Sequence, residues 1–146
     1  MHRDSALIPL SHQHHNGLAL CLLTRRSLAA DSSPANIATL ARRIVDRYEI
    51  ELINHFEIEE QVLFPACGAS PLIDRLVSEH RALESLAAQI GQSPTAGLLE
   101  QFCELLTTHI RLEENELFQQ VQESLPREVL DVVGKEIDRR AVRVCL

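Results

Sequence analysis

The chain contains His55-Phe-Glu-Ile-Glu59-Glu60-Gln-Val-Leu63-Phe64 and, later, His109-Ile-Arg-Leu-Glu113-Glu114-Asn-Glu-Leu117-Phe118. The two segments share a histidine, two glutamates, a leucine and a phenylalanine at identical offsets. A histidine-led segment precedes each of them, His14-His15-Asn-Gly-Leu18 in one case and His80-Arg-Ala-Leu83 in the other. A repeat that retains histidine and glutamate, and not only apolar residues, indicates two halves of one metal site.

The bulk composition fits one domain over residues 1–146, because 146 residues with 45% hydrophobic side chains can bury a core without staples. The formal charge of −7 argues against a nucleic-acid partner. No signal peptide follows Met1, and the longest apolar stretch, 18–23, is too short to span a membrane. We therefore expect neither a nucleic-acid nor a membrane partner.

The four cysteines are scattered along the chain without a C-x-x-C pair. They are Cys21, Cys67, Cys103 and Cys145. This pattern is typical of reduced thiols in a cytoplasmic protein, some of them small core residues. It argues against zinc-finger and thioredoxin-type chemistry, and Cys145 is expected to be exposed.

Proline residues mark the expected helix boundaries, and the segments between them have helical apolar spacing. Helices are predicted over about 10–30, 34–64, 71–90, 95–122 and 126–141. Short links favour antiparallel neighbours, so we predict an all-α, up-down-up-down four-helix bundle with a short C-terminal fifth helix. That last helix could form a homodimer contact or cap the bundle within the molecule.

The histidine and glutamate of each repeat lie four residues apart, so His55 and Glu59 share one helix face, as do His109 and Glu113. Apolar residues occupy the same faces, which places these side chains toward the interior. One such pair alone is more often a solvated ion pair than a set of ligands. Two pairs in register on buried faces reverse that balance, because a bound cation removes the cost of burying a carboxylate.

His80 also faces inward, on a stripe of apolar residues. Four helices then offer one His, His plus Glu, one His, and His plus Glu. Four imidazoles and two carboxylates suit two divalent ions with bridging carboxylates. Such mixed nitrogen and oxygen ligation suits non-haem iron, with manganese or zinc as rivals.

The helix-1 ligand is open between two neighbouring histidines. The His-x-x-Leu spacing of His80 and Leu83 selects His15 with Leu18, whereas an apolar stripe on this helix centres better on His14. We prefer His15, with His14 as the replacement and His12 as a possible extra ligand.

Several nearby residues have expected supporting roles. Glu60 and Glu114 are expected to form salt bridges or outer contacts with ligands rather than to bind metal. Glu51 is interpreted as a surface glutamate, although it could orient a ligand, and Tyr48 as a core residue, although it could line a pocket. Gly17 costs helix stability, which is consistent with a close backbone approach.

The order His, His-x-x-x-Glu, His, His-x-x-x-Glu, with H-F-x-x-E-E-x-x-L-F-P around His55, resembles the hemerythrin-like HHE cation-binding family over about residues 10–122. Members are four-helix bundles that hold a di-iron centre. The resemblance implies the following metal ligands: His15, His55, Glu59, His80, His109 and Glu113. It implies that Glu59 and Glu113 are the bridging carboxylates.

Two positions depart from the oxygen-carrying hemerythrins. Those proteins place a second histidine four residues after the helix-3 histidine, where this chain has Glu84, and an aspartate where it has Glu114. Reversible oxygen carriage is therefore in doubt. Glu84 could be a ligand, an outer partner of a ligand, or one end of a surface ion pair.

The leading hypothesis is a di-iron metal-binding protein, which binds or senses oxygen, nitric oxide, peroxide or iron. An alternative is a di-iron oxidoreductase or iron-centre repair enzyme, although no substrate pocket or redox-partner motif is visible. A second alternative is a structural helical bundle with a vestigial metal site.

Overall fold

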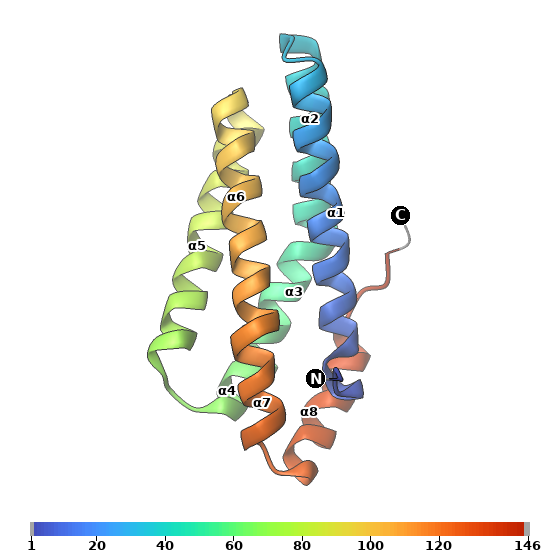
Figure 1. The fold of residues 1–146 in the computed structure, drawn as a ribbon, viewed down its shortest axis with the longest axis vertical. Helices are drawn as coiled ribbons and strands as arrows, with labels where there is room; N and C mark the ends of the chain where they lie inside the picture. Colours follow the sequence, from blue (N-terminus) through green and yellow to red (C-terminus); the bar gives the residue numbers. More distant parts are fainter. Residues whose placement is uncertain (1, 145–146) are drawn as a thin grey trace.

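The computed structural model describes residues 2–144, which form helices and no strand (Figure 1). The helical elements, in chain order, are η1 (Ser5–Leu7), α1 (Ile8–Ala30), α2 (Pro34–Arg47), η2 (Tyr48–Leu52), α3 (Ile53–Ile58), η3 (Glu59–Leu63), α4 (Phe64–Cys67), α5 (Pro71–Gln92), α6 (Ala96–Leu112), η4 (Glu113–Leu117), α7 (Phe118–Ser124) and α8 (Arg127–Arg140). The predicted all-α fold is confirmed. Within the described range, no helix is long and apolar enough to cross a membrane.

Several elements follow one another without a break, so the bundle consists of four rods. The first rod is α1, the second runs from α2 through α4, the third is α5, and the fourth runs from α6 through α7. Rod one contacts rods two and four, and rod three contacts the same two (Figure 1). This ring of neighbours is the predicted up-down-up-down bundle.

Polar side chains start three of the rods. Ser33, Ser70 and Thr95 each accept a hydrogen bond from a backbone N–H in the first turn of the helix that follows. Pro34 and Pro71 occupy the first helical position, where the missing N–H costs nothing. The boundaries predicted from these residues are therefore confirmed.

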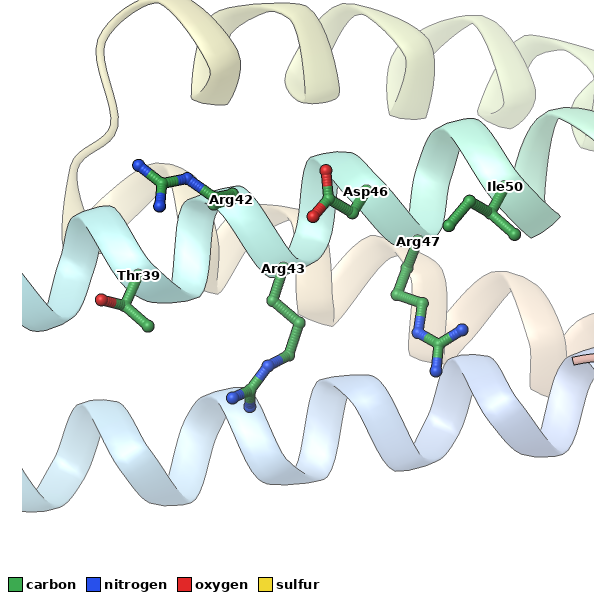
Figure 2. Close-up of a pocket in the computed structure, with 6 residues that line it drawn as sticks. All are labelled: Thr39, Arg42, Arg43, Asp46, Arg47 and Ile50. Atoms are coloured by element: carbon green, nitrogen blue, oxygen red, sulfur yellow. The ribbon is translucent and has the colours of Figure 1, made fainter. Parts of the chain in front are cut away.

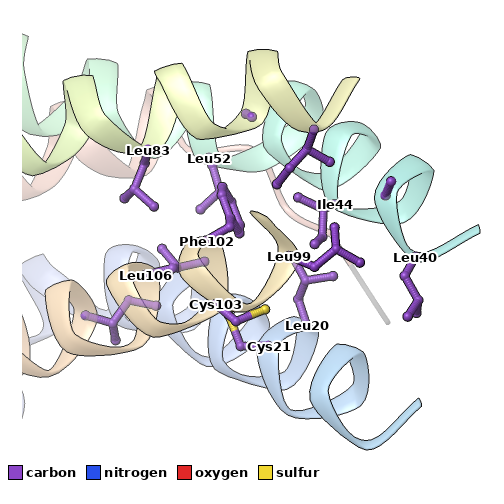
Figure 3. Packing of buried hydrophobic residues seen from close by; sticks show 14 of the residues in the cluster. Leu20, Cys21, Leu40, Ile44, Leu52, Leu83, Leu99, Phe102, Cys103 and Leu106 are labelled. Atoms are coloured by element: carbon purple, nitrogen blue, oxygen red, sulfur yellow. The ribbon is translucent and has the colours of Figure 1, made fainter. Parts of the chain in front are cut away.

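Two apolar clusters fill the bundle, one toward each end. The first contains Leu20, Leu52, Leu83 and Leu106 and reaches the α1–α2 turn (Figure 3). The second is formed with α8 and contains, among others, Leu10, Ile58, Leu76, Leu117 and Phe118. Along each rod, a buried histidine lies between members of one cluster and members of the other. The polar centre is thus sealed by hydrocarbon above and below.

The fifth helix, α8, closes one end of the bundle. Its buried residues Leu130, Val133 and Ile137 join the second cluster, and the helix packs against η1. At the contact, a Cβ built on Gly134 would lie 2.7 Å from the Ala6 Cβ and 2.9 Å from its Cα. Of the two roles expected for this helix, the structure therefore shows the intramolecular cap.

We predict that Gly134→Ala destabilises the protein by about 1–3 kcal/mol, because the added methyl group meets the backbone of η1 and the contact must open. Gly91→Ala is the matched control, since the nearest atom there, Val45 Cγ2, is 3.8 Å from the new Cβ. This control should gain about 0.5–1 kcal/mol from helix propensity. Urea unfolding of both variants measures the difference, and equal shifts would contradict the close packing of α8.

Candidate metal centre

Six ionisable side chains from all four rods meet at the boundary between the two apolar clusters. Each has an exposed fraction of 0–3%. They are His14 from α1, His55 and Glu59 from the second rod, His80 from α5, and His109 and Glu113 from the fourth rod. Burial of this many polar groups in one layer is costly unless a partner compensates them.

The six side chains form two groups of four that could each hold a metal ion. One group is His14, His55, Glu59 and Glu113, and the other is Glu59, His80, His109 and Glu113. Within each group the ligand atoms lie within 4.8 Å of one another. Because metal–nitrogen and metal–oxygen bonds are about 2.1 Å long, ligands on opposite sides of an ion are about 4 Å apart. The spacing therefore suits metal ions, and both carboxylates belong to both groups.

The structure places His14, and not the preferred His15, beside the other candidate ligands. His15 is exposed and lies outside both groups, whereas His14 is buried within one of them. The His-x-x-Leu spacing pointed to His15 because the residue three positions after His14 is Gly17 and not a leucine. A Cβ on Gly17 would lie 3.0 Å from Ile110 Cδ1, so a leucine does not fit there. The expected close approach at Gly17 is thus present.

The other two tentative ligands also lie outside both groups. Glu84 is partly exposed, and its Oε1 is 3.2 Å from Arg81 Nη1, which makes it one end of a surface ion pair. His12 is exposed. Glu84 therefore pairs with an arginine at the surface and not with the candidate metal ligands.

Each buried histidine is held at Nδ1 by an acceptor outside the centre. His14 Nδ1 lies 2.5 Å from Glu114 Oε2, and His55 Nδ1 lies 2.9 Å from Gln13 Oε1. His80 Nδ1 lies 2.8 Å from Glu60 Oε2, and His109 Nδ1 lies 2.8 Å from Glu79 Oε1. An Nδ1–H that donates outward leaves the Nε2 lone pair directed at the centre, which is the tautomer a metal ion requires.

Two of these outer acceptors were expected and two were missed. Glu60 and Glu114 make the predicted contacts with histidines. Gln13 and Glu79 were not predicted, because the histidines that they contact lie on other rods. Gln13 directly precedes His14 in the sequence and contacts His55. Glu79 directly precedes His80 and contacts His109.

The Nε2 atoms converge on the two shared carboxylates. His14 Nε2 is 2.7 Å from Glu113 Oε1, and His80 Nε2 is 3.1 Å from Glu59 Oε1. His55 Nε2 lies 3.3 Å from Glu59 Oε1, and His109 Nε2 lies 3.5 Å from Glu113 Oε2. Three atoms at the middle of the cluster are buried without a hydrogen-bond partner, namely Glu59 Oε2, Glu113 Oε2 and His109 Nε2.

The two carboxylates differ in protonation when no metal is bound. Burial and the neighbouring charge of Glu113 raise the pKa of Glu59 well above its ordinary value. Burial opposes ionisation of Glu113 too, but His109, His14 and His55 lower its pKa well below the ordinary value. Burial lowers the pKa of His80 to about 3, so this imidazole is neutral. The metal-free cluster thus holds a proton on Glu59 that a cation would replace.

Each repeat contains one π-helical turn that starts at its metal-facing glutamate. Phe64 N–H donates to Glu59 O in η3, and Phe118 N–H donates to Glu113 O in η4. A π turn holds one residue more than an α turn and occurs frequently at functional sites. At each wider turn, two consecutive glutamates contact the same histidine. In η3 and η4 the first glutamate lies at Nε2 and the second at Nδ1 of His80 and His14, respectively.

The phenylalanine that ends each repeat stacks on one of the two histidines outside the repeats, His14 or His80. We call these the lone histidines, and each belongs to the half of the chain that does not supply the phenylalanine. The ring of Phe118 lies 5.3 Å from that of His14, and the ring of Phe64 lies 5.9 Å from that of His80. These contacts explain why the repeat retains phenylalanine as well as histidine and glutamate.

Comparison with known families agrees with this geometry. Residues 7–121 match the family described as Hemerythrin HHE cation binding domain. The chain belongs to the hemerythrin HHE family. Neither the comparison with curated proteins nor that with solved structures gave a match.

The residues of this hemerythrin HHE domain fit a pair of metal ions. The unpartnered oxygens of Glu59 and Glu113 are available to ions, and the four imidazoles carry outward-fixed Nδ1–H groups. Imidazole and carboxylate together suit iron, zinc and manganese. The domain therefore offers two overlapping sets of candidate metal ligands.

The surface interpretation of Glu51 was wrong. In the HHE domain its side chain is buried, and one carboxylate oxygen accepts a hydrogen bond of 2.8 Å from Asn16 Nδ2. Asn16 lies two residues after His14, so this contact joins the first two rods beside the centre. The sequence could not reveal it, because the partner is on another helix.

A hollow of about 570 Å³ lies outside the His80 side of the HHE domain's centre. Tyr48, Phe56 and Glu60 line it, and the Phe56 ring stacks on His80 at 4.0 Å. Tyr48 packs against the first apolar cluster, as expected for a core residue, and also lines this hollow. Another hollow, on the outer face of α2, is lined by Arg42, Arg43 and Arg47 among others and includes none of the six central residues (Figure 2).

We predict that Glu59→Gln makes the metal-free domain progressively more stable than wild type as pH rises. A raised pKa in the folded state means that stability is fully present below pH 4.5, the ordinary value, and is lost as pH rises toward the folded value. The variant has no proton to lose, so the difference in unfolding free energy should grow by about 1.4 kcal/mol per pH unit in that window.

Chemical denaturation in chelator at several pH values from 5 to 7 measures this slope. Glu100→Gln, at an exposed position of α6, is the matched control. The same slope in both variants would show that burial of Glu59 is not the cause.

Proposed function

We propose that this hemerythrin HHE domain binds two iron ions at a carboxylate-bridged dinuclear centre. His14 and His55 would hold one ion, and His80 and His109 the other. Glu59 and Glu113 would bridge them. Manganese and zinc are the rival metals for the same donors.

The membership of Glu59 and Glu113 in both groups of four is the observation that carries this proposal. Each carboxylate already has one oxygen near histidines and a second oxygen buried without a partner. Two cations would neutralise the buried charge and use the free oxygens, which no protein group does. In a vestigial centre that binds no cation, the buried carboxylates would destabilise the fold without a compensating bound ion.

The protein groups prepare this centre for a small ligand. Glu60, Glu79, Glu114 and Gln13 hold the imidazoles in place, and the two apolar clusters exclude bulk water. Bound iron supplies a redox-active Lewis acid with coordination positions that the protein leaves open. We propose that oxygen, nitric oxide or peroxide binds there, or that the domain senses or holds iron.

A reducing, cytoplasmic setting is part of the proposal. Cys21, Cys67 and Cys103 are free thiols. Burial raises the pKa of Cys67 to about 11, which keeps that thiol protonated. Cys145 lies outside the described residues, so its expected exposure stays a prediction.

Iron loading tests the function directly. Aerobic protein loaded with Fe²⁺ and desalted should retain two iron ions per chain and show charge-transfer absorption in the near-ultraviolet and visible range. Elemental analysis of the same sample gives the stoichiometry. Iron below one ion per chain, with no such absorption, would refute the di-iron centre.

We predict that His14→Ala lowers the retained metal from two ions to one or none, because it removes a buried donor of the first group. His15→Ala is the matched control. The imidazole of His15 is exposed, so its removal should leave the stoichiometry unchanged. Elemental analysis after dialysis measures both variants. A loss of metal in His15→Ala with none in His14→Ala would return the assignment to the histidine preferred from the sequence.

A further inference from the structure

The two halves of the centre share two contacts around His14 and His80. The lone histidine of each half, His14 or His80, donates from Nδ1 to the second glutamate of the opposite repeat, Glu114 or Glu60. Each also stacks on the phenylalanine that ends that repeat. The sequence repeat is therefore also a repeat of the contacts around the two metal positions.

One outer contact differs in charge between the two halves. His109 Nδ1–H donates to Glu79, a carboxylate, over 2.8 Å, whereas His55 Nδ1–H donates to the amide oxygen of Gln13 over 2.9 Å. Gln13 and Glu79 hold the same place in the two halves, directly before His14 and His80. The difference is thus a neutral acceptor in one half and an anionic acceptor in the other.

Neighbouring groups explain why the acceptor in the first half is an amide. Gln13 Nε2 donates to Asn54 Oδ1 at 2.9 Å and to Val142 O at 3.3 Å. A carboxylate has no hydrogen to give these two oxygens and would repel them. Within residues 2–144, the recorded partners of the Glu79 carboxylate are His109 and Arg75, whose Nε lies 3.2 Å from the second oxygen.

Neighbouring arginines do not remove this difference in charge. Arg75 is 62% exposed, so water screens its pairing with Glu79. Arg81 pairs with Glu60 and Arg3 pairs with Glu114, so each of those carboxylates has an arginine partner, and Glu114 also accepts a hydrogen bond from Ser11 Oγ. Among the four acceptors behind the imidazoles, the one neutral group is Gln13, behind His55, whereas His109 has the carboxylate of Glu79.

A carboxylate behind a metal-binding imidazole strengthens electron donation from Nε2, and loss of such a partner typically lowers metal affinity by about 10- to 100-fold. We infer that the two metal positions are unequal, and that the His80–His109 position fills first and holds its divalent cation about tenfold or more tightly than the His14–His55 position. This inference rests on the proposed metal centre and adds an order of loading to it.

Zinc titration followed by nitrogen NMR of histidine-labelled protein tests the order without any activity measurement. At one equivalent of Zn²⁺, the Nε2 resonances of His80 and His109 should shift, while those of His14 and His55 stay near their metal-free positions. At two equivalents all four should shift. Simultaneous shifts at all four histidines, or shifts at His14 and His55 first, would overturn the inference.

The variant Glu79→Gln makes both outer acceptors neutral, so the preference for the His80–His109 position should disappear and its zinc affinity should fall about 10- to 100-fold. Arg75→Ala is the control, because it removes the ion pair of Glu79 and keeps the carboxylate on His109. Its loading order should match that of wild type.

The reciprocal variant Gln13→Glu/Glu79→Gln should reverse the order if it folds, which circular dichroism checks. An unchanged order in Glu79→Gln refutes the role of this carboxylate while the metal centre itself stands. Failure of wild type to bind zinc or iron at any ratio refutes the metal centre and the inference together.

Discussion

Two carboxylates, Glu59 and Glu113, lie side by side in the interior of a helical bundle, where neither is exposed to water. Their mutual repulsion and loss of hydration are compensated in the metal-free molecule by a proton on Glu59 and by the surrounding imidazoles. Most other features of the centre follow from this constraint. Four histidines approach the pair, and each is held from behind at Nδ1, which directs Nε2 at the carboxylates and makes it available to a metal ion.

The outer acceptors connect this requirement to the surface. Glu60, Glu79 and Glu114 contact arginines on their outer side, namely Arg81, Arg75 and Arg3, so each carboxylate lies between an imidazole and a cation. Gln13 has a different outer side, because Asn54 and Val142 bind its amide group. The segment after α8 is thereby part of the support for His55.

The bundle and most of its centre could be predicted from the sequence, because helix periodicity places His55 with Glu59 and His109 with Glu113 on inward faces. The choice in helix 1 could not. Ile8, Leu22 and Leu23 are exposed on α1, so apolar residues surround this helix and an apolar stripe does not indicate its inward side. The burial of Glu51 and the roles of Gln13 and Glu79 depend on partners from other rods, which spacing along one helix does not reveal.

The π-helical turns η3 and η4 have a genetic consequence. Each is equivalent to one residue inserted into an α-helix, so deletion of a single codon in either turn would leave a continuous helix. The residues of the same rod beyond the deletion would then rotate by about 100° around the helix axis. Phe64 or Phe118 would leave its histidine, while much of the apolar bundle could still form. A single deletion could thus remove the ring behind His14 or His80 and leave the helix itself intact.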